Sequence, residues 1–273
     1  MKSMAVIGCG NLASAIIKGF KNSGLKLNYH MYTPSFTRAK NLADEVAAIA
    51  HKNIADIPEC DFYLLGFKPQ QLKEASADLK KFISKKAIVI SLLASTSIEK
   101  LENIFSHSKF IRIMANTPIQ FGQGIALEQA SKAITPKERQ EVKKLFQTIS
   151  EVISLEQEDL FDYAMLIAAS GPAYLMSFAL YFEEILISKG IKKDQAQTIV
   201  KKLFSGTSFY MKEMNEPLNE LIAKVTSKAG VTAKVLEVFE QKKLRAIFDE
   251  GIEAGFKRSQ ELNSYKPTDY GGE

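Results

Sequence analysis

A short apolar run enters a glycine-rich turn close to the start of the chain, in the stretch Met4-Ala5-Val6-Ile7-Gly8-Cys9-Gly10-Asn11-Leu12-Ala13. The spacing Gly-x-Gly-x-x-Ala is typical of the first strand–helix turn of a dinucleotide-binding unit. Gly8 allows a tight turn, Gly10 allows the backbone to approach a pyrophosphate, and Ala13 allows the next helix to pack closely on the strand. The alternative interpretation is an ordinary glycine-rich turn that binds nothing.

The first half of the chain alternates apolar runs with amphipathic segments, which predicts a parallel, doubly wound sheet. Strands are expected at 4–7, 28–32, 46–50, 61–67, 87–92, 110–113 and 124–127, with a further one near 151–155. Helices are expected at 11–22, 36–43, 69–82, 97–104 and 136–147. From Gln157 onward there is no convincing strand pattern, and long helical patterns fill 158–187, 192–214 and 241–262.

These patterns predict an α/β protein made of two domains. Residues 1–155 are expected to form a Rossmann-like dinucleotide-binding domain, and residues 156–263 an all-helical domain. Residues 264–273 contain Pro267 and two glycines without an apolar period. We therefore expect them to form a disordered tail.

Composition excludes several classes of protein. The 36 basic and 31 acidic residues are interspersed and give a net charge of +5, which indicates a solvated surface rather than a nucleic-acid interface. Two cysteines, Cys9 and Cys60, imply no disulfide framework. The three histidines show no metal-ligand spacing, so no metal site is expected. The apolar start is too short for a signal peptide, and a cytoplasmic location is predicted.

One stretch, residues 163–182, carries no charged side chain and is about as long as a membrane span. Ser170-Gly171-Pro172 interrupts it. We therefore expect a helix that is buried on all sides in the core of an intertwined homodimer, rather than a segment in a membrane.

The choice of dinucleotide is predicted from the end of the second strand. A ribose-binding acid is expected about 20 residues past the glycines, but residues 31–38 contain none, and the first acid is Asp44. Ser35 and Arg38 stand there instead, and a hydroxyl and a cation suit a 2′-phosphate. The sequence therefore predicts NADPH, with NADH as the weaker cofactor. Alternatively, these two residues only begin the next helix.

Four further motifs follow in order: Gly66-Phe67-Lys68-Pro69-Gln70, Met114-Ala115-Asn116-Thr117-Pro118, Ser170-Gly171-Pro172-Ala173-Tyr174, and Val225-Thr226-Ser227-Lys228-Ala229-Gly230-Val231-Thr232. Together with the glycine-rich opening, they resemble the pyrroline-5-carboxylate reductase family from about residue 4 to residue 262. The resemblance implies hydride transfer from NAD(P)H to the imine carbon of 1-pyrroline-5-carboxylate, which gives L-proline in the last step of proline biosynthesis. It also implies that residues 156–263 mediate dimerisation and bind substrate, in a homodimer that can assemble further, and that residues 1–155 bind NADP.

The resemblance also assigns roles to individual residues. It implies that Ser227 and the backbone N–H groups of Gly230 and Val231 hold the substrate carboxylate. The hydroxyl of Thr232 would meet the ring nitrogen, which makes Thr232 the expected catalytic residue. The cofactor would contact residues from the other motifs, with the pyrophosphate near Asn11 and Leu12, the adenosine side near Lys68 and Pro69, and the nicotinamide near Asn116 and Thr117.

The chain departs from the family pattern at three places. Ala115 stands where the family has proline, Ala168-Ala169 where it has Ser-Gly, and Lys228-Ala229 where it has Pro-Gly. A divergent imine reductase with another substrate and a non-catalytic NADP-binding sensor therefore stay open. A β-hydroxyacid dehydrogenase is disfavoured, because 178–184 offers no catalytic lysine.

Overall fold

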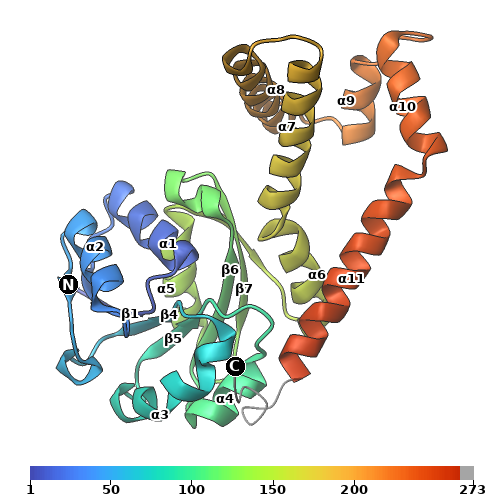
Figure 1. Ribbon diagram of the computed structural model, residues 1–273. Helices are drawn as coiled ribbons and strands as arrows, with labels where there is room; N and C mark the ends of the chain where they lie inside the picture. Colours follow the sequence, from blue (N-terminus) through green and yellow to red (C-terminus); the bar gives the residue numbers. More distant parts are fainter. Residues whose placement is uncertain (265–273) are drawn as a thin grey trace. The chain divides into compact units, whose positions relative to one another are not determined.

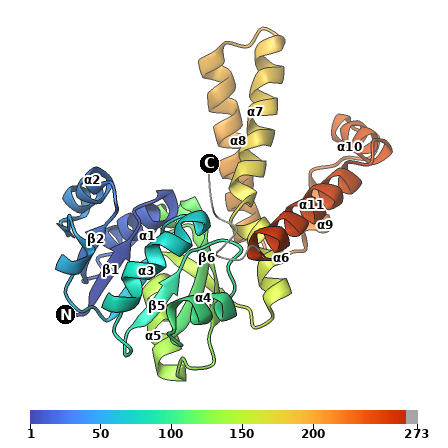
Figure 2. The same ribbon diagram turned by 60° about the horizontal axis from the view of Figure 1, so that its bottom comes forward.

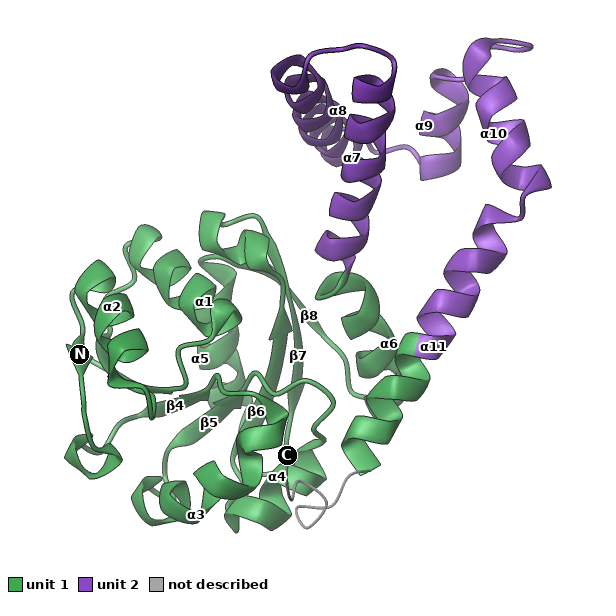
Figure 3. Cartoon of the chain, viewed as in Figure 1, with its two compact units in different colours: residues 1–170, 255–273 green, residues 171–254 purple. Residues whose placement is uncertain are grey.

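The computed structural model describes residues 1–264, and packing divides the chain into two compact units (Figure 3). Unit 1 contains residues 1–170 and the chain from residue 255 onward, and unit 2 contains residues 171–254. Of the predicted tail, Ser264 is the last residue of a helix, and 265–273 lie outside the described residues.

Unit 1 is built on a sheet of eight strands in the order β3-β2-β1-β4-β5-β6-β7-β8 (Figure 1). The strands are β1 (Ser3–Ile7), β2 (Asn28–Tyr32), β3 (Ile49–Ala50), β4 (Phe62–Leu65), β5 (Ile88–Ser91), β6 (Phe110–Ala115), β7 (Gly124–Ala130) and β8 (Ser150–Ser154). The helices between them are α1 (Asn11–Asn22), α2 (Phe36–Val46), α3 (Leu72–Phe82), α4 (Ile98–Phe105) and α5 (Pro136–Gln147). Three short 3-10 turns are η1 (Ile54–Asp56), η2 (Pro69–Gln71) and η3 (Thr117–Phe121).

The expected parallel sheet is confirmed for β1 to β6, but it is wrong for β7, which runs antiparallel to β6. Only the short turn η3 joins these two strands. A parallel connection needs a crossover of a dozen or more residues, so this turn permits only an antiparallel pair. Helix α5 then provides the crossover that makes β7 and β8 parallel.

The predicted strand at 46–50 is also shorter than expected. Helix α2 continues to Val46, which is buried together with Ala39, Leu42 and Ala43 at helical spacing. Ala47 then takes a left-handed conformation that ends the helix, and only β3 pairs with β2. The apolar side chain of Val46 thus belongs to the buried face of the helix.

Helices cover both faces of the sheet. Successive β1 side chains point to opposite faces, so that Met4 and Val6 join one apolar core and Ala5 and Ile7 join the other. The first core is completed by α1, α2 and α5, and the second by α3 and α4. Helix α6 (Glu158–Ala168) adds a third cluster, in which Phe161 and Met165 pack on Met114 and Leu127.

Unit 2 is helical throughout. It contains α7 (Gly171–Ser188), α8 (Lys193–Glu213), α9 (Leu218–Lys224), α10 (Val231–Gln241) and the first part of α11 (Leu244–Ser264), which continues into unit 1. Helices α7 and α8 lie side by side in both views (Figures 1 and 2). The predicted helix at 158–187 is interrupted between Ala168 and Gly171, and Pro172 then lies in the first turn of α7, where its missing N–H costs nothing.

Within the single chain, no residue of α7 is buried. The predicted burial of residues 163–182 in the core of a homodimer stays a prediction. Leu175, Met176 and Tyr181 are each more than half exposed. By length and composition alone, the stretch 158–188 could cross a membrane, although core helices of soluble proteins meet the same criterion.

We predict that two imidazoles make folding sensitive to acid. His30 lies 3.0 Å from His51, between Nδ1 and Nε2, and burial together with the charge of His51 lowers the pKa of His30. Burial likewise lowers the pKa of His107, whose Nε2 lies 3.1 Å from the carbonyl oxygen of Ala87. Below about pH 6.5, the unfolded chain therefore binds more protons at these two histidines than the folded chain does. The free energy of unfolding falls as the pH is lowered through this range.

The measurement is the urea midpoint at neutral pH and at about pH 5.5. The double variant His30→Gln, His107→Gln should lose less stability between the two values than the wild type. An equal loss in both proteins would contradict the prediction.

Candidate active site

The glycine-rich turn is packed directly against the end of β4. Gly8 has φ of +93°, and a Cβ placed on it would lie 2.5 Å from the backbone nitrogen of Phe67. A Cβ on Gly66 would lie 2.5 Å from the carbonyl oxygen of Gly8 and 2.6 Å from the Cβ of Ala13. Only glycine fits at both positions, and the small side chain of Ala13 packs as the sequence predicts.

The beginning of α1 offers donors to an anion. Gly10 is the N-cap, no side chain caps this helix end, and no acid stands in the first turn. The first N–H groups of the helix therefore have no partner within the helix, and the helix dipole favours negative charge there. A pyrophosphate fits this cradle in both shape and charge.

Cys9 lies in the same turn but is not a reactive group. Its side chain is buried, and burial raises the pKa of the thiol to about 11. The thiol stays protonated at neutral pH, as expected of a small apolar filler.

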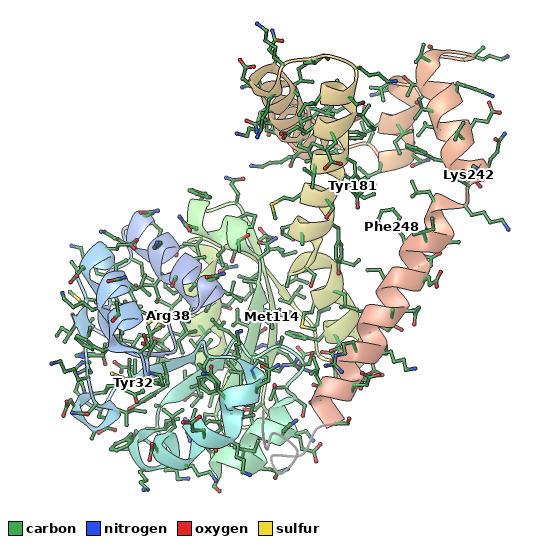
Figure 4. The ribbon with its side chains drawn as sticks, in the orientation of Figure 1. Tyr32, Arg38, Met114, Tyr181, Lys242 and Phe248 are labelled. Carbon is green, nitrogen blue, oxygen red and sulfur yellow. The ribbon has the colours of Figure 1, made fainter. Side chains whose placement is uncertain are left out.

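A pocket of about 400 Å³ lies on one side of the turn. It brings together five of the predicted cofactor residues, namely Gly8, Gly10, Ser35, Arg38 and Lys68. Figure 4 labels Arg38 and Tyr32, which both line this pocket. Among residues 1–264, no side chain is paired with the exposed guanidinium of Arg38. Pro69 begins the turn η2 but does not line the pocket. We call this space the adenosine pocket.

A second pocket of about 480 Å³ lies on the other side and brings together Asn11, Leu12, Asn116 and Thr117. It also contains Met114, which is labelled in Figure 4. The side chain of Asn116 is held in place, because its Oδ1 accepts a hydrogen bond from the backbone N–H of Ile125 at 3.1 Å. We call this space the nicotinamide pocket. Since Gly10 lines the first pocket and Asn11 the second, the two meet at the glycine-rich turn.

The predicted substrate residues lie together at one turn of unit 2, between α9 and α10. Gly230 is the N-cap of α10, and a Cβ on it would collide with the Oγ of Ser227. Ser227, Val231 and Thr232 are exposed on this turn. One expectation needs correction: the N–H of Gly230 donates to the carbonyl oxygen of Ser227 at 3.0 Å, so it is not a free donor. The free N–H groups at this helix start belong to Val231 and the residues after it.

Other pocket residues were not predicted from the sequence. Glu74 and Asp78 of α3 line the adenosine pocket, and Ser95, Arg258 and Ser259 line the nicotinamide pocket. The acids sit on the polar side of an amphipathic helix, where a charged residue carries no signal of its own. Ser95 and Ser259 are far apart in the sequence, and no spacing rule connects them.

The fold and the pockets define a nucleotide-dependent oxidoreductase with a helical second part. Residues 3–95 match the family described as NADP oxidoreductase, coenzyme F420-dependent. Residues 158–262 match the family described as pyrroline-5-carboxylate reductase dimerisation.

Several relatives that align with nearly the whole chain are named pyrroline-5-carboxylate reductase. The chain is 28% identical to the pyrroline-5-carboxylate reductase of Staphylococcus haemolyticus, covering 94% of this chain and 96% of that protein. It is also 28% identical to that of Aquifex aeolicus, with coverages of 95% and 97%. The solved structure of the Streptococcus pyogenes enzyme aligns with a TM-score of 0.84 at 25% identity, covering 95% of this chain and 98% of that chain. Nearly the whole chain therefore resembles pyrroline-5-carboxylate reductases, and residues 158–262 match the dimerisation domain of that family.

A solved structure with a bound nucleotide has the same fold. The pyrroline carboxylate reductase of Plasmodium falciparum, with NADP bound, aligns with a TM-score of 0.86 over 96% of this chain and 98% of that chain. At 21% identity, this likeness concerns the fold alone.

We predict that Ala229→Gly stabilises unit 2. Ala229 has φ of +56°, a left-handed conformation that costs a residue with a side chain roughly 1 kcal/mol more than glycine. Removing the methyl group should therefore raise the free energy of unfolding by about 1 kcal/mol, measured by urea denaturation.

The matched control is Ala233→Gly, the same change inside α10. It should lower the free energy of unfolding by about 1 kcal/mol. If both variants lost stability, the prediction for Ala229 would fail.

Proposed function

We propose that the protein reduces 1-pyrroline-5-carboxylate to L-proline with NADPH, the last step of proline biosynthesis. The observation that carries this proposal is the match, over nearly the whole chain, to proteins named pyrroline-5-carboxylate reductase. The two pockets that meet at the glycine-rich turn support it, because a dinucleotide needs a site on each side of its pyrophosphate.

The cofactor residues act mainly by position. Gly8 and Gly10 let the backbone approach the pyrophosphate, and the N–H groups of Asn11 and Leu12 face it. Lys68 would border the adenosine, and Pro69 would shape the turn beside it. Asn116 and Thr117 would border the nicotinamide, which supplies a hydride to the imine carbon when the cofactor is bound.

The turn between α9 and α10 is our proposed substrate site. The hydroxyl of Ser227 and the N–H of Val231 would hold the carboxylate, at a helix start whose dipole favours an anion. Gly230 contributes by leaving room for Ser227. Thr232 would bond the ring nitrogen and hold the imine for the hydride. No carboxylate or histidine is required, because this imine protonates readily in water.

NADPH is the proposed cofactor, with NADH weaker. The adenosine pocket presents the hydroxyl of Ser35 and the guanidinium of Arg38, both exposed to a ligand. A guanidinium can form two parallel hydrogen bonds with a phosphate, which NADH lacks at the 2′ position.

A cytoplasmic homodimer, and further assembly of dimers, completes the proposal. The exposed apolar side chains of α7 support the dimer, because such a surface in water calls for a partner. The two free cysteines agree with a reducing compartment. A domain division near residue 155 also remains a proposal, and the family match that begins at residue 158 supports it. We propose no nucleic-acid or membrane partner.

We predict that Thr232→Ala reduces turnover of 1-pyrroline-5-carboxylate. Removing one hydrogen bond to a reacting group should lower kcat/KM on the order of tenfold or more. NADPH oxidation is followed by absorbance, and proline is quantified separately.

Thr226→Ala is the control, because the Thr226 hydroxyl already bonds the carbonyl oxygen of Ile222 at 2.8 Å. This variant should keep its activity. A wild-type protein that bound NADPH tightly without turnover would favour a reductase of another cyclic imine or a sensor.

We predict that Arg38→Ala raises the KM for NADPH by about tenfold, the worth of one charge-assisted hydrogen bond. The KM for NADH should stay the same. Lys40→Ala removes a cation from the same helix, but Lys40 is paired with Asp44 at 2.8 Å and should have no effect. Equal losses with both cofactors would show that Arg38 does not recognise the 2′-phosphate.

A further inference from the structure

An arginine is buried at the centre of unit 1. Arg112 of β6 is 1% exposed, and its guanidinium binds two carboxylates of α6. Its Nη1 lies 2.6 Å from Glu158 Oε1, and its Nη2 lies 3.3 Å from Asp162 Oδ1. The ring of Phe161 lies below it, with the ring centre 4.3 Å from the guanidinium carbon. These contacts attach α6 to the sheet.

The contacts continue from Asp162 to a third element. The hydroxyl of Ser259, on α11, donates to Asp162 Oδ2 at 3.5 Å and lies 2.8 Å from the hydroxyl of Ser95. All three residues are at most 5% exposed. We call Arg112, Asp162, Ser259 and Ser95 the buried polar chain. It joins β6, α6, α11 and the loop after β5.

The loop after β5 is held in an uncommon conformation. Ser95 has φ of +51°, which a residue with a side chain adopts at some cost and keeps only when its surroundings enforce it. Two further bonds attach this loop region to α11: Ser97 N–H donates to Asn263 Oδ1 at 3.1 Å, and Lys100 Nζ donates to the Asn263 carbonyl at 2.8 Å.

The buried polar chain ends at the nicotinamide pocket. Ser95 and Ser259 line the pocket together with Asn116 and Thr117. Arg112 lies on β6, the strand that leads directly to Asn116. The two ends of the buried polar chain, Arg112 and Ser95, are therefore both connected to residues that line the nicotinamide pocket. A shift of any member would therefore move residues that face the nicotinamide.

A buried ion pair is weak evidence of a gain in stability. Burial raises the pKa of the Asp162 carboxyl, against the opposing effect of Arg112, because a buried site disfavours the charged form. Apolar residues of similar volume in place of such buried pairs are often equally stable or more so. A chain of directed bonds, in contrast, fixes the distances between the elements that it joins.

We propose that Arg112, Asp162 and Ser259 are positioning residues, which hold Ser95 and the wall of the nicotinamide pocket so that the nicotinamide is placed for hydride transfer. The expected effect on kcat rests on the proposed function. These residues would influence turnover without touching the substrate.

The test uses Ser259→Ala and Asp162→Asn in the full chain. Three quantities are measured: kcat and KM with NADPH and 1-pyrroline-5-carboxylate, the nicotinamide fluorescence of bound NADPH, and the affinity for 2′,5′-ADP, which occupies only the adenosine pocket. We expect kcat to fall by about tenfold, since small misplacements of reacting groups carry costs of this size. The nicotinamide fluorescence should change as well, while the affinity for 2′,5′-ADP should not.

The matched control is Glu128→Gln. Glu128 of β7 is fully buried and paired with Arg139, at 2.9 Å between Oε2 and Nη2, and it lines neither pocket. This variant should lose stability but keep kcat and the fluorescence. The proposal is overturned if both test variants keep kcat and fluorescence within error, or if Glu128→Gln reduces them equally.

Failure of the proposed function would look different. If the wild type did not turn over 1-pyrroline-5-carboxylate, the reaction would be wrong, and the fluorescence and 2′,5′-ADP measurements would still decide the role of the buried polar chain. If Asp162→Asn did not fold, Ser259→Ala, which removes a single hydroxyl, would decide it.

Discussion

The two pockets of unit 1 depend on one close backbone contact, between Gly8 after β1 and Gly66 after β4. A Cβ on either residue would collide with the backbone of the other segment. Gly66 N–H donates to the carbonyl oxygen of Ile7, and Gly8 N–H donates to that of Tyr32, both at 2.8 Å. The hydrogen bonds between neighbouring strands therefore continue past the strand ends on both sides of β1. The strand order reverses at this point, and the adenosine and nicotinamide pockets can therefore open on either side of one turn.

Sequence patterns predicted the positions of the helices and strands better than the directions in which the strands run. The helices at 11–22 and 136–147 have the expected bounds, because apolar spacing, and for the second helix the capping box of Thr135 and Glu138, are local signals. Periodicity carries no information about strand direction, and only the short connection after β6 distinguishes an antiparallel strand from a parallel one. Likewise, Arg38 and Lys68 could be proposed as cofactor residues from the local sequence, whereas Ser95 and Ser259 meet only through the packing of the whole of unit 1.

The burial of unit 2 could not be predicted from one chain. An apolar sequence shows that a helix must be buried against another surface, but it does not show whether the same chain or another one provides that surface. Within unit 2, Phe178 and Phe248 stack with ring centres 5.7 Å apart, yet both helices keep large apolar side chains in water. A helix such as α7, long and apolar with no buried residue, gains its main stabilisation only when a further surface covers it.

The turn before α10 contains Lys228 and Ala229, two of the residues at which the chain departs from the pattern of the family that it resembles. Gly230 has an extended conformation, so this glycine is needed for space, because of Ser227, and not for backbone freedom. Ala229 takes the left-handed conformation that a glycine would adopt more easily. The alanine therefore costs stability in this turn. Lys228, which is exposed on the same turn, places a positive charge next to Ser227 in the sequence.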